Sequence, residues 1–352
     1  MSTQDKLKKV FEWLAFAGLA ALSCSWTATS FTRWLDIDIF TAGFLALALY
    51  VGASFCFSIA AKALDKYADY DDNAQRRKHF VFGLIFFLFF WTFSLVTNAH
   101  NFIYKTAIER VTKKDLALTK DYLEGLNQET GNLEIKKINE AYNAIDSKVH
   151  DLLDYLLREI GNTDRPGIGP LFNNVLDQIE NTIGGDFHFN RQSPGNNMTA
   201  WNATYKKYEE QANAALKRRR LDFDKEILDV RRSIDSDKIE NLVTRMNMGL
   251  YDIEKNGCGQ NIMRQIIKDL NLAWAHINTE TCLKCINFKD GDEEYFTGEN
   301  AISNTEKLKN ADIVIGEYFA GKYKAEGFLW KFMLSLLVDL LAFGFFHVAK
   351  NK

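Results

Sequence analysis

The chain has 352 residues and a formal net charge of −3, values that would suit a water-soluble protein. Its apolar residues are distributed very unevenly, however. Residues 10–97 and 328–348 are strongly apolar, whereas the long segment between them is rich in Lys, Glu, Asp and Asn. This distribution excludes an ordinary soluble globular protein and indicates an integral membrane protein.

Four segments are long and apolar enough to cross a bilayer. A membrane-spanning helix needs about 20 mainly apolar residues to cross roughly 30 Å of hydrocarbon, and residues 10–30, 37–61, 80–98 and 328–348 satisfy this requirement. The first segment is not expected to be a signal peptide, because it has no clear small-x-small cleavage site and a second span follows almost at once.

The spans divide the chain into a membrane domain and one large insertion. We expect an all-α protein with an N-terminal membrane domain at residues 1–98, an inserted helical domain at 99–327, the fourth span at 328–348 and a short tail at 349–352. Such an arrangement makes the lipid bilayer the first predicted partner of the chain.

Basic residues near the spans predict the orientation of the chain. The loop between the first and second spans carries only Arg33, whereas the N-terminal tail, the loop between the second and third spans, and the C-terminal tail are all rich in Lys and Arg. Both termini are therefore predicted to be cytoplasmic and residues 99–327 to lie outside the cytoplasm. The lack of a dense disulfide framework favours a bacterial inner membrane. Four basic residues on the predicted outer side favour the opposite orientation: Lys105, Arg110, Lys322 and Lys324. We give them less weight, because long domains cross the membrane largely regardless of their charge.

The inserted domain has the periodicity of packed helices. Between residues 133 and 160, apolar residues recur at alternating gaps of three and four, the heptad pattern of a coiled coil or helical bundle: Ile135, Ile138, Tyr142, Ile145, Val149, Leu152 and Leu156. The Gly- and Pro-containing segment 161–170 should end this helix.

Further helices are expected along the rest of the insertion. The sequence predicts a short helix over 170–183, a loop over 184–197, one long helix over 199–255, an amphipathic helix over 261–278 and an irregular segment over 286–303. From residue 304 the helical pattern resumes and continues into the fourth span. The residues after the third span also remain helical, so two antiparallel helices should form a stalk.

A run of basic residues, 217–220, lies within the predicted long helix. It is followed immediately by Asp222, Asp224 and Glu226. Mixed charge of this kind is typical of a solvated helix face, whereas a nucleic-acid surface is predominantly basic. We therefore expect no nucleic-acid partner.

Three cysteines in the insertion suggest a covalent or metal link. A compartment outside the cytoplasm favours a disulfide between Cys258 and either Cys282 or Cys285, and the third cysteine would then remain unpaired. The alternative is a zinc site formed by Cys258, His276, Cys282 and Cys285, which has suitable ligand types but only one Cys-x-x-Cys arm. A redox role for the Cys-x-x-Cys pair ranks third, because no thioredoxin-like context surrounds it.

The sequence contains no phosphate-binding loop, no nucleophile elbow and no His-Glu-x-x-His motif. We therefore predict a protein that is not an enzyme, and no cofactor. The leading hypothesis is a sensor or scaffold whose inserted domain binds a protein partner or ligand and couples it to the membrane helices.

The alternative function is an oligomeric channel or transporter subunit. It depends on Asp339, near the centre of the fourth span, because an ionisable residue in a membrane segment is a candidate functional residue. Small neighbours such as Ser335 indicate that this helix face turns towards other helices. We expect either a protonated Asp339 bonded to a hydroxyl such as Ser54 or Thr92, or an ionised Asp339 lining a wet path.

Overall fold

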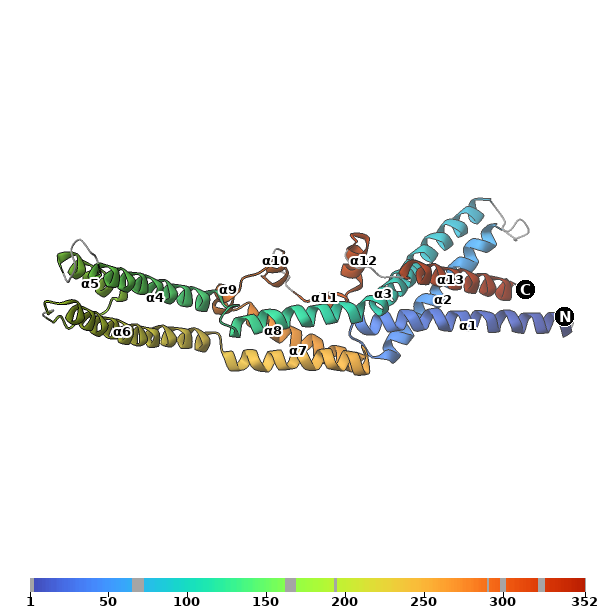
Figure 1. Ribbon diagram of the computed structural model, residues 1–352. Coiled ribbons are helices and arrows are strands. Elements are labelled where there is room, and N and C mark those ends of the chain that lie inside the picture. Colours follow the sequence, from blue (N-terminus) through green and yellow to red (C-terminus); the bar gives the residue numbers. More distant parts are fainter. Residues whose placement is uncertain are drawn as a thin grey trace. The chain divides into compact units, whose positions relative to one another are not determined.

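The chain folds into helices throughout the part that the structure describes. A computed structural model describes residues 3–64, 73–161, 169–192, 195–289, 291–297, 302–321 and 327–351. These ranges contain helices, turns and one isolated antiparallel bridge between Asn132 and Ile286, and no β-strand (Figure 1). The prediction of an all-α protein is confirmed.

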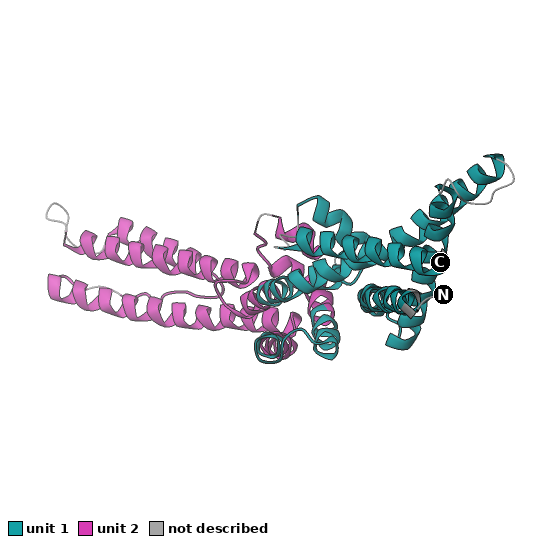
Figure 2. Cartoon of the chain, turned by 90° about the vertical axis from the view of Figure 1, so that its right-hand side faces the viewer, with its two compact units in different colours: residues 1–117, 249–270, 302–352 teal, residues 118–248, 271–301 magenta. Residues whose placement is uncertain are grey.

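The helices form two compact units (Figure 2). Unit 1 contains Met1–Ala117, Gly249–Leu270 and Ile302–Lys352, and unit 2 contains Leu118–Met248 and Asn271–Ala301. Each unit is described separately below.

Four helices are long and apolar enough to cross a membrane: α1 (Thr3–Trp34), α2 (Ile39–Leu64), α3 (Asn73–Asn127) and α13 (Phe328–Asn351). They contain the four predicted spans, except that residues 37–38 precede α2. Asp38 accepts hydrogen bonds from the backbone N–H groups of Phe40 and Thr41 and so caps the start of α2.

In unit 1, α1 and α13 pack against each other and both pack against α2. Tyr50, Phe87 and Phe343 lie at the centre of a buried aromatic cluster that also includes Phe16 and Trp91. The outward faces of these helices and of α3 expose large apolar side chains, with Phe40 87% exposed. Others are Phe44, Leu47, Phe82, Ile85, Phe89, Leu329, Met333 and Leu337. Apolar surface of this extent is costly in water and suits contact with lipid, which supports an integral membrane protein.

In unit 2, helix α4 (Leu133–Ile160) packs against α5 (Pro170–Ile183) and α6 (Met198–Ser233). The predicted heptad positions Ile135, Val149 and Leu156 are buried, but Leu153 is buried more deeply than the predicted Leu152. An α-helix with 3.6 residues per turn drifts relative to a strict heptad, and this drift explains the shift. The four predicted contact residues of α5 are all buried: Phe172, Leu176, Ile179 and Ile183.

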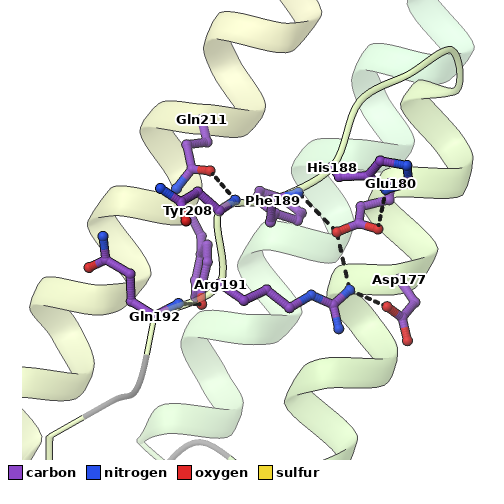
Figure 3. Close-up of polar contacts among 9 residues, drawn as sticks. Asp177, Glu180, His188, Phe189, Arg191, Gln192, Tyr208 and Gln211 are labelled. Carbon is purple, nitrogen blue, oxygen red and sulfur yellow. Dashed lines mark hydrogen bonds and ion pairs between the residues drawn. The ribbon is translucent and has the colours of Figure 1, made fainter.

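The predicted loop after α5 is non-helical where it is described and is fixed by side chains (Figure 3). Arg191 forms ion pairs with Asp177 and Glu180 of α5. On the other side, the backbone N–H of Gln192 donates to the hydroxyl of Tyr208 of α6, at 3.1 Å. The loop therefore links α5 to α6.

The prediction of one helix over 199–255 is wrong. The structure has two helices, α6 and α7 (Ser236–Asn256), separated at Ile234 and Asp235. Asp235 adopts a left-handed conformation with φ 56°, which Asp tolerates better than most residues. Its carboxylate accepts a 3.3 Å hydrogen bond from the Lys238 N–H and thereby caps α7.

The remaining helices are α8 (Gln260–Ile277), α9 (Glu280–Cys285), α10 (Asp292–Thr297), α11 (Asn304–Lys307) and α12 (Ala311–Phe319). Helix α8 confirms the predicted amphipathic segment. The irregular segment, in contrast, contains α10. The helix expected to run from residue 304 into the fourth span is also wrong, because α12 ends at Phe319 and is followed by Gly321 at φ 79°. Of the two helices predicted to form a stalk, only the continuation of the third span is confirmed, in α3.

Candidate functional site: a buried polar stripe

Asp339 lies inside the apolar core of unit 1 with none of its side-chain surface exposed. Its Oδ2 accepts a hydrogen bond from the indole Nε1 of Trp91, at 3.2 Å, and the hydroxyl of Ser23 also interacts with the carboxylate. Its Oδ1 has no hydrogen-bond partner among the described residues. The carboxyl group is thus enclosed by α1, α3 and α13 and only partly satisfied.

The expected hydroxyl partners of Asp339 are not the ones found. Ser54 donates to the carbonyl oxygen of Tyr50 and Thr92 to that of Leu88, each within its own helix. The indole of Trp91 takes their place because α3 presents this residue towards α13.

Asn98, on α3, forms hydrogen bonds to both α1 and α13. Its Nδ2 donates to Ser335 Oγ on α13 at 2.9 Å and to Ser23 Oγ on α1 at 3.4 Å. Its Oδ1 accepts from Thr27 Oγ1 on α1 at 3.2 Å. All four side chains are buried. The predicted residue Ser335 therefore faces a polar partner.

A further set of contacts continues towards the C-terminal end of α1. Ser30 Oγ lies 2.6 Å from His100 Nδ1, and His100 Nε2 lies 2.9 Å from the carbonyl oxygen of Leu308. Arg33 Nη1 donates to Asn101 Oδ1 at 2.7 Å. We call the following set the polar stripe: Ser23, Thr27 and Ser30 of α1, Trp91, Asn98 and His100 of α3, and Ser335 and Asp339 of α13.

Sequence reasoning identified only Ser335 and Asp339 of this stripe. One signal was present, because Ser23, Thr27 and Ser30 are spaced by four and three residues and so share one face of an apolar helix. Interhelical hydrogen bonds of this kind hold membrane helices together. Ionisable side chains inside a membrane also mark pathways for protons and other ions.

The described residues give no support to the predicted link between the cysteines and His276. All five cysteines are free thiols, so the predicted disulfide has no support in the structure. Cys258 belongs to unit 1, and Cys282 and Cys285 belong to unit 2. The part of the chain that the structure describes contains no group of three or more His, Cys, Asp or Glu side chains that could hold a metal ion.

The local contacts of His276 and Cys282 are those of a packed core. His276 Nε2 lies 3.0 Å from the carbonyl oxygen of Ile234 and 3.8 Å from the sulfur of Cys282. Burial lowers the pKa of His276 and raises the pKa of both Cys282 and Cys285. The imidazole and the thiols are therefore kept neutral at pH 7.

Comparisons with known proteins provide no relative for this chain. No protein-family model, no curated protein and no solved structure matches it.

Proposed function

We propose that the chain is a non-enzymatic, multi-pass membrane sensor or scaffold. The chain lies in a bacterial inner membrane. Both of its termini are in the cytoplasm, and residues 99–327 lie outside the cytoplasm. The inserted helical domain binds a protein partner or ligand, and the membrane helices respond to that binding through the polar stripe.

The unbroken length of α3 carries this proposal. It is a single helix of 55 residues that contains both the third predicted span and the segment after it. Trp91 and Asn98 of the polar stripe lie in its first half, and the buried Leu123 and Leu126 lie near its end. Continuous backbone hydrogen bonding makes a helix stiff, so a shift or rotation at one end also moves the other.

The polar stripe provides an element that such a movement would change. Asn98 bonds to α1 and α13 at the same time, so a displacement of α3 must lengthen or exchange these hydrogen bonds. In a low-dielectric core, hydroxyl and amide groups exchange partners between discrete arrangements, because an unpaired polar group is costly.

Hydrogen exchange on the full-length protein in nanodiscs tests the coupling. The perturbation is Leu156→Asp, which places a charge in the core of α4, α5 and α6. The control is Leu157→Asp, on the exposed side of the same helix. We expect Leu156→Asp to raise exchange both in α4 and in the α3 and α13 peptides that contain Asn98 and Ser335, and the control to change neither. Increased exchange confined to α4–α6 would contradict the coupling.

A channel or transporter subunit is the second candidate, and the buried Asp339 favours it. Ion flux into proteoliposomes separates the two functions. The sensor proposal predicts no flux above that of empty vesicles. Flux by the wild-type protein that disappears in Asp339→Asn would favour the channel, because this variant keeps the side-chain shape and loses the charge. A ring-shaped oligomer in nanodiscs would point the same way.

A further inference from the structure

A small cavity of about 90 Å³ lies in unit 1 where α1 ends, and side chains of α1, α3 and α8 line it. Its charged lining residues are Arg33, Asp36, Arg264 and Lys309, and the ring of Tyr104 also lines it. About 10–15 Å³ is enough for one water molecule, so the cavity accommodates a compact polyatomic group but not a whole lipid.

The cavity has an excess of two positive charges, because three cations and one carboxylate line it. Asp36 is already engaged, since its Oδ1 lies 3.0 Å from Arg264 Nη2. Arg33 instead donates to a neutral amide, that of Asn101, and its guanidinium lies 4.2 Å from the centroid of the Tyr104 ring. No carboxylate among the described residues forms an ion pair with Arg33.

Residues around the cavity add further positive charge and one hydrogen-bond donor that has no acceptor. Lys105 is close enough to Arg33 and Lys331 to be repelled by both. Beside Arg33, the buried Asn101 Nδ2 has no acceptor within the described ranges. Basic residues held near one another with a free hydrogen-bond donor are suited to an anion with several acceptor oxygens.

The position of the cavity along the helices favours a lipid over a dissolved anion. Its residues from Thr29 to Asp36, at and just after the end of α1, lie at the predicted outer end of the first span, and Tyr104 lies just beyond the third span. This is the depth of the phospholipid headgroups. Leu35, beside the cavity residues in the sequence, is 48% exposed and apolar.

We infer that this cavity binds the phosphate group of an anionic phospholipid, with Arg33 as the principal ligand and Arg264 and Lys309 beside it. The planar guanidinium matches the geometry of phosphate oxygens, while the acyl chains lie outside against the exposed apolar faces of the helices. Of the four basic residues that oppose the usual charge distribution, Lys105 lies near this site. The inference goes beyond the proposed function and does not depend on it.

Binding of fluorescent phosphatidylglycerol to the full-length protein in a neutral detergent tests the site. We expect Arg33→Gln to weaken this binding about tenfold, the loss of roughly one charge-assisted hydrogen-bonding group, and Arg33→Lys to weaken it less. Lys309→Gln, at a half-buried position, should also weaken it. Lys206→Gln, an equal charge change at an exposed site on α6, should not.

Two competitors distinguish the sources of the phosphate. Phosphatidylcholine and millimolar inorganic phosphate should both fail to displace the probe. Displacement by inorganic phosphate would show a site for free anions and overturn the lipid assignment. Unchanged affinity in both Arg33→Gln and Lys309→Gln, with normal size-exclusion profiles, would overturn the site itself.

Discussion

At the scale of single residues, Asn98 joins α3 to two other helices through three hydrogen bonds. It bonds to α1 and α13 from a fully buried position on α3. Interhelical hydrogen bonds in membrane proteins are worth about 0.6 kcal/mol on average, and leaving buried partners unpaired costs about 1–3 kcal/mol.

We therefore predict that Asn98→Val lowers the stability of the protein in detergent by about 1–3 kcal/mol, because the buried Ser335 hydroxyl loses its partner. Thr92→Val is the control, since the Thr92 hydroxyl bonds only to the carbonyl oxygen of Leu88 in its own helix. Thermal unfolding followed by circular dichroism measures both. Equal effects of the two substitutions would mean that Asn98 is not a link between helices.

A second residue-scale prediction concerns acid sensitivity through His276. Burial, followed by repulsion from Lys238, lowers its pKa below the ordinary 6.5. The unfolded chain therefore binds a proton at a higher pH than the folded chain, so the contribution of His276 to stability is complete above pH 6.5 and is lost as the pH falls through the lowered pKa. The slope for one proton is at most about 1.4 kcal/mol per pH unit.

The variant His276→Gln keeps a donor for the Ile234 carbonyl oxygen and does not titrate. Between pH 7.5 and 5 we expect wild-type melting temperatures to fall more steeply than those of the variant. Parallel curves for the two proteins would show that His276 is already protonated in the folded state or is solvated.

At the scale of helices, Gly83 fixes the close approach of α3 to α2. A Cβ atom added at Gly83 would lie 2.7 Å from the backbone nitrogen of Ala60 and 2.9 Å from the carbonyl oxygen of Cys56. Gly43, another glycine in an apolar helix, has no atom within 4 Å of such a Cβ. Small residues commonly allow membrane helices to pack this closely.

We predict that Gly83→Ala destabilises the protein by about 1–3 kcal/mol, since the backbones must separate. Gly43→Ala should be neutral or stabilising because alanine favours helix. The fraction of protein that remains monodisperse after heating in detergent compares the stability of the two variants with that of the wild type. If Gly83→Ala matched the wild type, the two helices would not approach each other as described.

The core of α4, α5 and α6 gives the next prediction at this scale. Leu156 has no exposed surface, while its neighbour Leu157 is 46% exposed. Leu156→Ala should cost about 2–5 kcal/mol through lost burial and a cavity, and Leu157→Ala less than about 0.5 kcal/mol. Urea unfolding of the full-length protein, followed at a fluorophore attached to α6, compares them. Similar midpoints would mean that α4 does not pack through the face predicted from its heptads.

The helices that sequence patterns identified are those with a regular apolar spacing. The contact positions of α5 follow from spacing alone, and α4 follows apart from the drift to Leu153. The break at Asp235 was missed because Ser-Ile-Asp-Ser contains neither Gly nor Pro, and the spacing of apolar residues does not reveal that an Asp adopts a left-handed conformation.

Asp339 was identifiable because a charged residue is conspicuous among apolar residues. Its partners were not, because isolated hydroxyl and amide residues occur in any span, and only packing brings Asn98 next to Ser335.

At the scale of the whole molecule, the distribution of Lys and Arg predicts which side of the membrane each segment occupies. Basic segments near spans remain in the cytoplasm, and the loop containing Arg76, Arg77 and Lys78 is the most basic one between spans. Within the proposal, the basic residues on the other side, such as Arg33 and Lys105, lie beside the lipid-binding cavity and do not determine orientation.

Reporter fusions test this orientation directly. Alkaline phosphatase, which folds only outside the cytoplasm, should be active when fused after Asn190, in the loop between α5 and α6. It should be inactive when fused after Asp72, which lies outside the described residues. A cytoplasm-active reporter at the same two positions should give the opposite pattern and controls for expression. Activity of the phosphatase after Asp72 and not after Asn190 would place the inserted domain in the cytoplasm. The cavity at the end of α1 would then face the inner leaflet, where its cations would follow the usual charge rule.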